Sequence, residues 1–191
     1  MEINKIIAKI RFKLNDANEV KFSDYDVLEA INESYKQYRE ICMQEAPAFL
    51  SVIRNGTVEA ESNVILVSDI AEIIELRTAD RVLKAKRKLP NDNATGEPTM
   101  YAVGAEDNAL CLFLHPVPTK DFEYQLMCIE QVKDLTKDNS IEIPNELANC
   151  IIDLSVNALN NNPQGYIDAE EQMRLILRRY IPQRDVVDSY Y

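Results

Sequence analysis

Apolar residues at the start of the chain recur with helical spacing. One set follows the i, i+3, i+4, i+7 rule and predicts the apolar stripe of a first helix: Ile3, Ile6, Ile7, Ile10 and Leu14. The polar stretch 15–21 breaks this pattern. Ser23, with Asp26 three residues later, is a typical helix N-cap. The second helix then carries its own stripe: Leu28, Ile31, Tyr35, Tyr38 and Cys42. Two such helices predict an antiparallel hairpin.

The pattern changes after Pro47, where β-branched residues become frequent. Asn55-Gly56 between two alternating stretches predicts a β-hairpin. Residues 64–67 are a buried-strand candidate, whereas the pattern leaves open whether residues 73–76 form a strand or a helix. Three further strands are expected in TMYAV, ALCLFL and FEYQLMCI, which turn-rich stretches separate. The centre of the chain is therefore predicted to form a mostly antiparallel β unit.

Helical spacing returns in the last third of the chain. Pro144 and Asn145 predict a helix start, and the stripe of that helix is Leu147, Ile151, Leu154 and Ala158. A last helix, from about residue 167 to residue 180, is expected to carry Met173, Ile176, Leu177 and Tyr180 on one face. The predicted fold is α+β. Residues 1–47 and 140–181 form a helical bundle, residues 48–139 form an inserted β subdomain, and residues 182–191 form an extended C-terminal arm.

Composition adds limits to this plan. A chain of 191 residues with 46% hydrophobic residues can bury a sizeable core. No apolar run is long enough for a membrane span, and the start MEINKIIAKIRFKLND lacks the apolar core of a signal peptide. We therefore expect a soluble protein made in a cytoplasm, with no membrane partner.

Residues with potential catalytic or ligand-binding chemistry are sparse. The four cysteines lie far apart in apolar runs, which predicts reduced, buried thiols rather than a zinc site or a disulfide framework: Cys42, Cys111, Cys128 and Cys150. Cys111 and Cys128 lie in strands expected to be neighbours, but we predict no bridge. No glycine-rich phosphate loop occurs, and the many acids leave a carboxylate-only magnesium site open without a paired-acid motif to mark it. We expect no catalysis, no cofactor and no metal.

His115 is the only histidine, and it stands between Leu114 and Pro116. A general base needs an orienting partner and a reacting group within hydrogen-bond range. Asp107 and Asp121 are the acids nearest in sequence, and both lie beside turn signals. His115 is therefore interpreted as the exit residue of a strand that the following prolines end.

The net charge of −11 disfavours tight binding to nucleic acid. One run is basic, with Asp80 as its only acid: Arg77, Arg81, Lys84, Lys86, Arg87 and Lys88. It is either a solvated loop or edge strand protected by lysines, or a docking patch for an acidic neighbour. The nine tyrosines are likewise typical both of helix cores and of protein interfaces.

The end of the chain concentrates apolar and aromatic residues. The stretch from Pro182 has two readings, a frayed terminus or a docking arm. In the second reading the docking anchors are Val186, Val187, Tyr190 and Tyr191.

The order of the pieces is informative. FSDYDVLEAINESYKQY precedes a β unit that holds NGTVEAESNVILVSD, GEPTMYAV and a strand of the type L-x-L-x-P-x-P, formed here by Leu112, Leu114, Pro116 and Pro118. An I-x-I-P-x-E stretch then opens the C-terminal helices, with Ile141, Ile143, Pro144 and Glu146. Across about residues 3–160 this arrangement resembles the head-to-tail adaptor proteins of short-tailed bacteriophages, the tail tubular protein A type. The basic run and the last helix with its tail depart from that pattern.

The resemblance implies a structural virion protein. It would form a ring of about twelve copies that joins the portal protein to a tail nozzle or tail tube protein, after assembly in the host cytoplasm. Such a ring would carry roughly −132 formal charges, so DNA would pass through its lumen without sequence-specific binding. The alternative is a small soluble binding or accessory module of bacterial or phage origin without catalysis.

Overall fold

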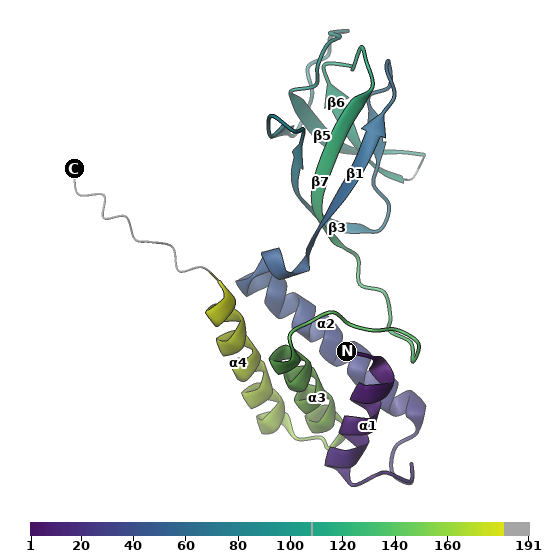
Figure 1. Cartoon of the computed structure of the whole chain (residues 1–191), viewed down its shortest axis with the longest axis vertical. Coiled ribbons are helices and arrows are strands. Elements are labelled where there is room, and N and C mark those ends of the chain that lie inside the picture. The colour runs from purple at the N-terminus through teal and green to yellow at the C-terminus, as the bar shows by residue number, and fades with distance from the viewer. Residues whose placement is uncertain (108, 182–191) are drawn as a thin grey trace, which may run out of the picture. The chain divides into compact units, whose positions relative to one another are not determined.

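The computed structural model describes residues 1–107 and 109–181, which divide into two compact units. The helical unit contains Met1–Phe49 and the described residues from Val132 onward, and the β unit contains Leu50–Gln131. Helices from both ends of the chain flank an inserted β unit, which confirms the predicted α+β class (Figure 1). The predicted arm, with Val186, Val187, Tyr190 and Tyr191, lies outside the described residues.

Among the described residues the helical unit has four α-helices, whose bounds are α1 Ile3–Leu14, α2 Asp24–Glu45, α3 Asn145–Leu159 and α4 Pro163–Tyr180. The predicted start of α2 is confirmed, because Ser23 Oγ accepts from the N–H of Asp26 and the Asp26 carboxylate accepts from the N–H of Ser23. Helix α4 begins earlier than predicted. Pro163 occupies its first turn and the Asn162 side chain accepts from the N–H of Gly165, and both are typical start signals of a helix.

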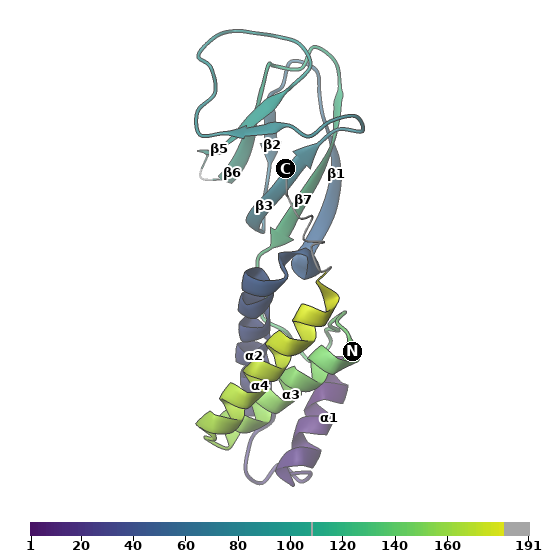
Figure 2. The same cartoon turned by 90° about the vertical axis from the view of Figure 1, so that its left-hand side faces the viewer.

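Helix α3 packs against each of the other three helices, and it lies between α1 and α4 in Figures 1 and 2. This position explains why Ala148, Ile152 and Ser155 are buried together with the predicted stripe. Ser155 Oγ lies 3.0 Å from Ser34 Oγ, so small side chains separate α2 from α3. Ala158 was wrongly included in the stripe, since it is exposed near the end of the helix.

A buried ion cluster organises the connection between α1 and α2. Arg11 is 6% exposed, and its guanidinium lies 3.3 Å from Asp16 Oδ2 and donates to Asp24 Oδ1 and the carbonyl of Phe22. The Asp16 carboxylate in turn accepts from three backbone N–H groups, those of Val20, Lys21 and Phe22. The Arg11–Asp16 pair therefore supplies hydrogen-bond partners to the carbonyl of Phe22 and to the N–H groups of residues 20–22.

Four carboxyl groups of the helical unit have a lowered pKa, which predicts acid sensitivity. In each case the largest cause is a hydrogen bond to the carboxylate, from the Lys21 N–H to Asp16, from Lys137 to Asp24, from Ser23 to Asp26 and from Arg178 to Glu45. A second hydrogen bond lowers the pKa further for two of them, from Arg11 to Asp24 and from Arg174 to Glu45. A pKa that is lower in the folded than in the unfolded state stabilises the fold above the unfolded value, and this stability is lost as the pH falls.

We therefore expect the helical unit to lose stability progressively below about pH 4, the range of unfolded carboxyl groups. Urea unfolding followed by far-UV circular dichroism at several pH values measures this. Asp16→Asn should start less stable near neutral pH and lose less on acidification. A wild-type stability that does not fall toward about pH 3 would contradict the prediction.

The boundary predicted at residue 139 lies too late in the chain, because residues 132–139 belong to the helical unit. Asn32 on α2 exchanges two hydrogen bonds with the backbone of Leu135, and the N–H of Ile3 donates to the carbonyl of Asn139. Lys137 also pairs with Asp24. These contacts join residues far apart in sequence, so local composition did not indicate them.

The strands of the β unit in the described residues are β1 Ser51–Val58, β2 Val64–Leu66, β3 Ile70–Arg77, β4 Lys84–Lys86, β5 Met100–Glu106, β6 Ala109–His115 and β7 Phe122–Glu130. They form one sheet of order β1-β7-β3, seen side by side in Figure 2, and a second of order β2-β6-β5-β4. All pairings are antiparallel except β4 with β5, so the mostly antiparallel prediction is confirmed.

Both sheets contribute to one apolar core. Its buried residues are Val58, Ile65, Val67, Ile70, Leu76, Leu83, Tyr101, Leu112, Leu114, Phe122, Leu126 and Cys128. Burial of such side chains is the main stabilising term for a unit of this size.

The hairpin predicted at Asn55-Gly56 is wrong, because both residues lie inside β1 and pair with β7. A two-residue type I′ turn needs positive φ at both positions, and neither residue has it. Gly56 instead makes room for a ring, since a Cβ placed on it would lie 2.4 Å from the hydroxyl of its cross-strand partner Tyr124. Pairing with a distant strand overrode the local turn preference.

Candidate docking surface of the β unit

The basic run occupies the side of the β unit where a short connection joins β3 to β4. Arg77 ends β3, and Lys84 and Lys86 lie on β4, which is an edge strand of the four-stranded sheet. All residues of β4 are exposed, as are Arg87 and Lys88 directly after it. The structure thus shows a lysine-bearing edge strand, a common protection against unwanted strand pairing. The docking role remains a hypothesis.

Local hydrogen bonds hold this basic side in place. The N–H of Thr78 donates to the carbonyl of Arg81 over 2.8 Å, and Thr78 Oγ1 accepts from the N–H of Arg81 over 3.3 Å. The N–H of Leu83 then donates to the carbonyl of Leu76. Because the chain reverses tightly here, β4 begins directly beside the end of β3.

The six cations divide into two groups. Arg77 donates to Gln125 Oε1 over 3.0 Å, and Arg81 lies 2.7 Å from Glu97 and donates to the carbonyl of Pro98. The side chains of the other four cations have no ion pair or hydrogen bond within the part of the chain that the structure describes: Lys84, Lys86, Arg87 and Lys88. These four are therefore available to an anionic partner.

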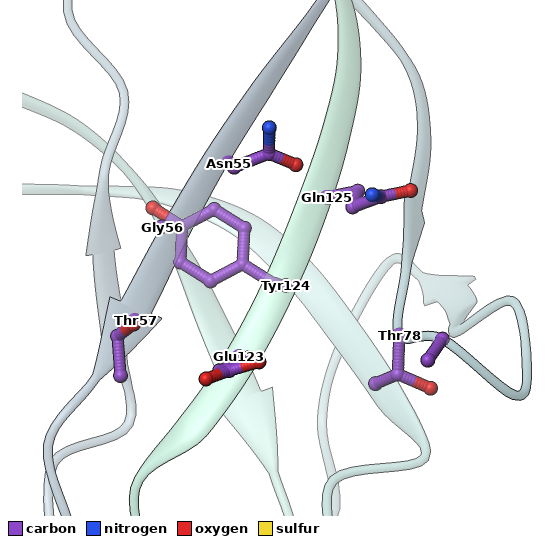
Figure 3. Close-up of a pocket in the computed structure, with 8 residues that line it drawn as sticks. Asn55, Gly56, Thr57, Thr78, Glu123, Tyr124 and Gln125 are labelled. Atoms are coloured by element: carbon purple, nitrogen blue, oxygen red, sulfur yellow. The ribbon is translucent and has the colours of Figure 1, made fainter.

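A hollow of about 390 Å³ lies on β1 and β7 beside the connection after β3. Figure 3 shows the ring of Tyr124 lying across Gly56, with the amides of Asn55 and Gln125 beside it. Glu123 contributes a carboxylate, and burial raises the pKa of the Tyr124 hydroxyl. The other lining residues are Thr57, Thr78 and Ala79.

His115 ends β6, as predicted, but it is more buried than a rim residue, at 8% exposure. Its Nε2 atom lies 3.5 Å from Asp92 Oδ1, and its carbonyl accepts from the N–H of Thr99. The partner is thus neither Asp107 nor Asp121 but an acid from the connection before β5, which sequence distance did not reveal. The carboxylate lies at the long end of hydrogen-bond range.

All four cysteines are buried and free, as predicted. Cys111 and Cys128 are not strand neighbours, since β6 and β7 belong to different sheets. Burial raises the pKa of Cys42 to about 11 and that of Cys150 to about 11. These two thiols are therefore protonated near neutral pH, which is the opposite of an activated nucleophile.

In the two described ranges, 1–107 and 109–181, no group of three or more histidine, cysteine or acidic side chains is placed to hold a metal ion. No helix there is both long and apolar enough to cross a membrane. Scans against family models and against curated proteins found no match to this chain.

Proposed function

We propose that the protein is a structural virion component that forms a ring between the portal and the tail of a short-tailed phage. The observation that carries the proposal is the placement of both resemblance motifs. Strand β6 ends at His115, inside the L-x-L-x-P-x-P motif, and α3 begins at Asn145, inside the I-x-I-P-x-E motif. Between the two motifs lie strand β7 and then the return from the β unit to the helical unit.

Exposed apolar side chains of the helical unit support an assembling protein. Phe12 is 82% exposed, Val20 83% and Tyr25 72%. Val20 lies in the connection between α1 and α2, and Phe12 and Tyr25 lie on the helix turns beside it. Large side chains of this kind are enriched in interfaces between subunits. A ring would cover part of this apolar surface by side-by-side contacts.

The acidic balance of the chain supports a channel role rather than DNA recognition. A ring of about twelve copies would repel the phosphate backbone instead of holding it through counterion release. The ring then continues the DNA channel of the portal without sequence-specific contacts, and it performs no catalysis and needs no cofactor.

Native mass spectrometry of the purified protein, alone and with the portal protein of the same phage, tests the proposal. We expect a closed oligomer of about twelve copies, formed either alone or on the portal. A monomer that does not bind the portal would instead favour the alternative function, a small binding or accessory module.

The C-terminal arm yields a separate prediction. Its anchors, Val186, Val187, Tyr190 and Tyr191, are aromatic or apolar residues of the kind that dominate binding energy when buried. A variant that ends at Ile181 should bind the portal, or a neighbouring copy, at least about tenfold more weakly than the full chain, as measured by biolayer interferometry. Equal affinity of the two chains would contradict a docking role for the arm.

A further inference from the structure

The last turn of α1 carries an exposed aromatic side chain. Phe12 is 82% exposed. It lies two residues from both Ile10 and Leu14, which are buried, so it points away from the side of α1 that packs on α2 and α3. Phe12 is therefore a knob, a large apolar side chain that its own chain leaves uncovered.

An apolar hollow of about 390 Å³ lies at the turn between α3 and α4. Its apolar lining is formed by Ala158, Pro163, Tyr166 and Ile167, and three asparagines complete it. Ile167 is 47% exposed there. The volume falls within the lower part of the range for pockets that take small ligands, roughly 300–1,000 Å³, so one aromatic side chain fits in it.

Phe12 and the hollow lie at the same end of the helical unit. The backbones of Met1, before α1, and Ile141, before α3, are hydrogen-bonded, and Lys13 near the end of α1 pairs with Asp153 in the second half of α3. These two helices therefore run in the same direction and end together, and α4 begins four residues after α3 ends. Helix α3 lies between α1 and α4 (Figures 1 and 2), so Phe12 and the hollow belong to opposite flanks of the bundle.

The free charges beside the two features are complementary. The acids of residues 16–26 already pair with Arg11 or cap α2, whereas Lys21 is exposed and has no ion pair within the described residues. Beside the hollow, Asp168 and Glu171 are exposed, and neither forms an ion pair in the part of the chain that the structure describes. A cation thus lies near the knob and two acids lie near the hollow.

We propose that Phe12 of one copy inserts into the hollow between α3 and α4 of the next copy, with Lys21 facing Asp168 and Glu171. Two different, complementary features on opposite flanks of one chain make a heterologous contact, which closes into a ring when the rotation allows it. A second copy is the occupant because the same chain carries both the knob and a hollow of matching size and charge. The inference rests on the ring-forming role proposed above and identifies the surfaces that would set the order of the copies.

Cross-linking tests the contact directly and leaves the knob intact. A chain with Lys21→Cys and Asp168→Cys, treated with a short bis-maleimide in the assembled state, should give a ladder of covalent multimers on a denaturing gel. Each single variant should give no product beyond a dimer. The native cysteines should not react, since all four are buried. In the matched control, Leu175→Cys replaces Asp168→Cys. Leu175 is exposed on α4 but lies roughly 10 Å further along the helix, so no ladder is expected.

Two further variants test the knob and the hollow themselves. Phe12→Ser removes the knob, and Ala158→Trp fills the hollow. Each should self-associate at least about tenfold more weakly than the wild type in sedimentation velocity, because a buried aromatic anchor is lost. Leu175→Ser removes an exposed apolar side chain outside this hollow and should assemble like the wild type. Circular dichroism checks that the variants are folded, which we expect because the replaced residues are exposed.

Three outcomes would overturn the proposal. If the wild type assembles but the paired cysteines give no ladder and both variants assemble equally well, the surfaces are wrong although the ring role stands. If the ladder appears only after the chain is shortened to end at Ile181, residues 182–191 fill the hollow instead. If the wild type stays monomeric with and without portal, the ring role fails and this contact fails with it.

Discussion

Replacing Arg11 with alanine is expected to destabilise the helical unit by about 3–5 kcal/mol, the usual cost of removing one partner of a buried ion pair. The substitution would leave Asp16, which is 3% exposed, without the guanidinium that lies 3.3 Å from it. The carbonyl of Phe22 would also lose its donor. Urea unfolding followed by far-UV circular dichroism measures the loss.

Two control variants sharpen this prediction. Arg11→Lys keeps the charge but has no planar fork, so it should restore only part of the stability. Arg178→Ala removes a cation that also pairs with a carboxylate, Glu45, but from the exposed surface of α4, and its effect should be far smaller. Equal losses for Arg11→Ala and Arg178→Ala would mean that the buried cluster does not hold the turn between α1 and α2.

Replacing Leu126 with alanine is expected to destabilise the β unit by about 3 kcal/mol, within the range for large-to-small changes in a core. Leu126 is 2% exposed at the centre of β7, where it pairs with Arg54 of β1 and Leu76 of β3. Hydrogen exchange of the β7 amides, followed by NMR, reports this loss directly, because it measures local as well as global opening.

Ile53→Ala provides the matched control, since it removes an aliphatic side chain from the neighbouring strand β1. Ile53 is 53% exposed and therefore has little buried area to lose. Its exchange rates should stay close to those of the wild type. If the two alanine variants exchanged at equal rates, the core of the β unit would not lie where the two sheets meet.

The helices were predictable because their signals are local. The stripe from Ile3 to Leu14 and the Ser23 cap lie within a few residues of the structure they specify, and both predictions are confirmed. The start of α4 was predicted too late, because Asn162-Pro163 is typical both of a helix end and of a helix start. Here only the packing of α4 against α3 distinguishes the two.

The sheet was predictable in part. Strand positions followed from alternation, but their partners did not, because β7 pairs with both β1 and β3 across more than half of the β unit. The error at Asn55-Gly56 has this origin, since the ring of Tyr124 lies across Gly56 from a strand far away in sequence. Contacts of that range leave no signal in a single local window.

The charged residues were also predictable only in part. The basic run was visible in the sequence as six cations with one acid. Which of them are already paired was not visible, because Glu97 and Gln125 reach Arg81 and Arg77 through the fold. Glu59, Glu61 and Asp121 likewise belong to two separate connections that come together only when β1 pairs with β7.

Imaging the protein bound to the portal tests the ring role most directly. Cryo-electron microscopy of the purified protein mixed with the portal protein of the same phage should show a closed ring on the portal axis, with about twelve copies around an open channel. Portal particles that carry no added density at saturating protein concentration, with the protein itself still monomeric, would contradict the account.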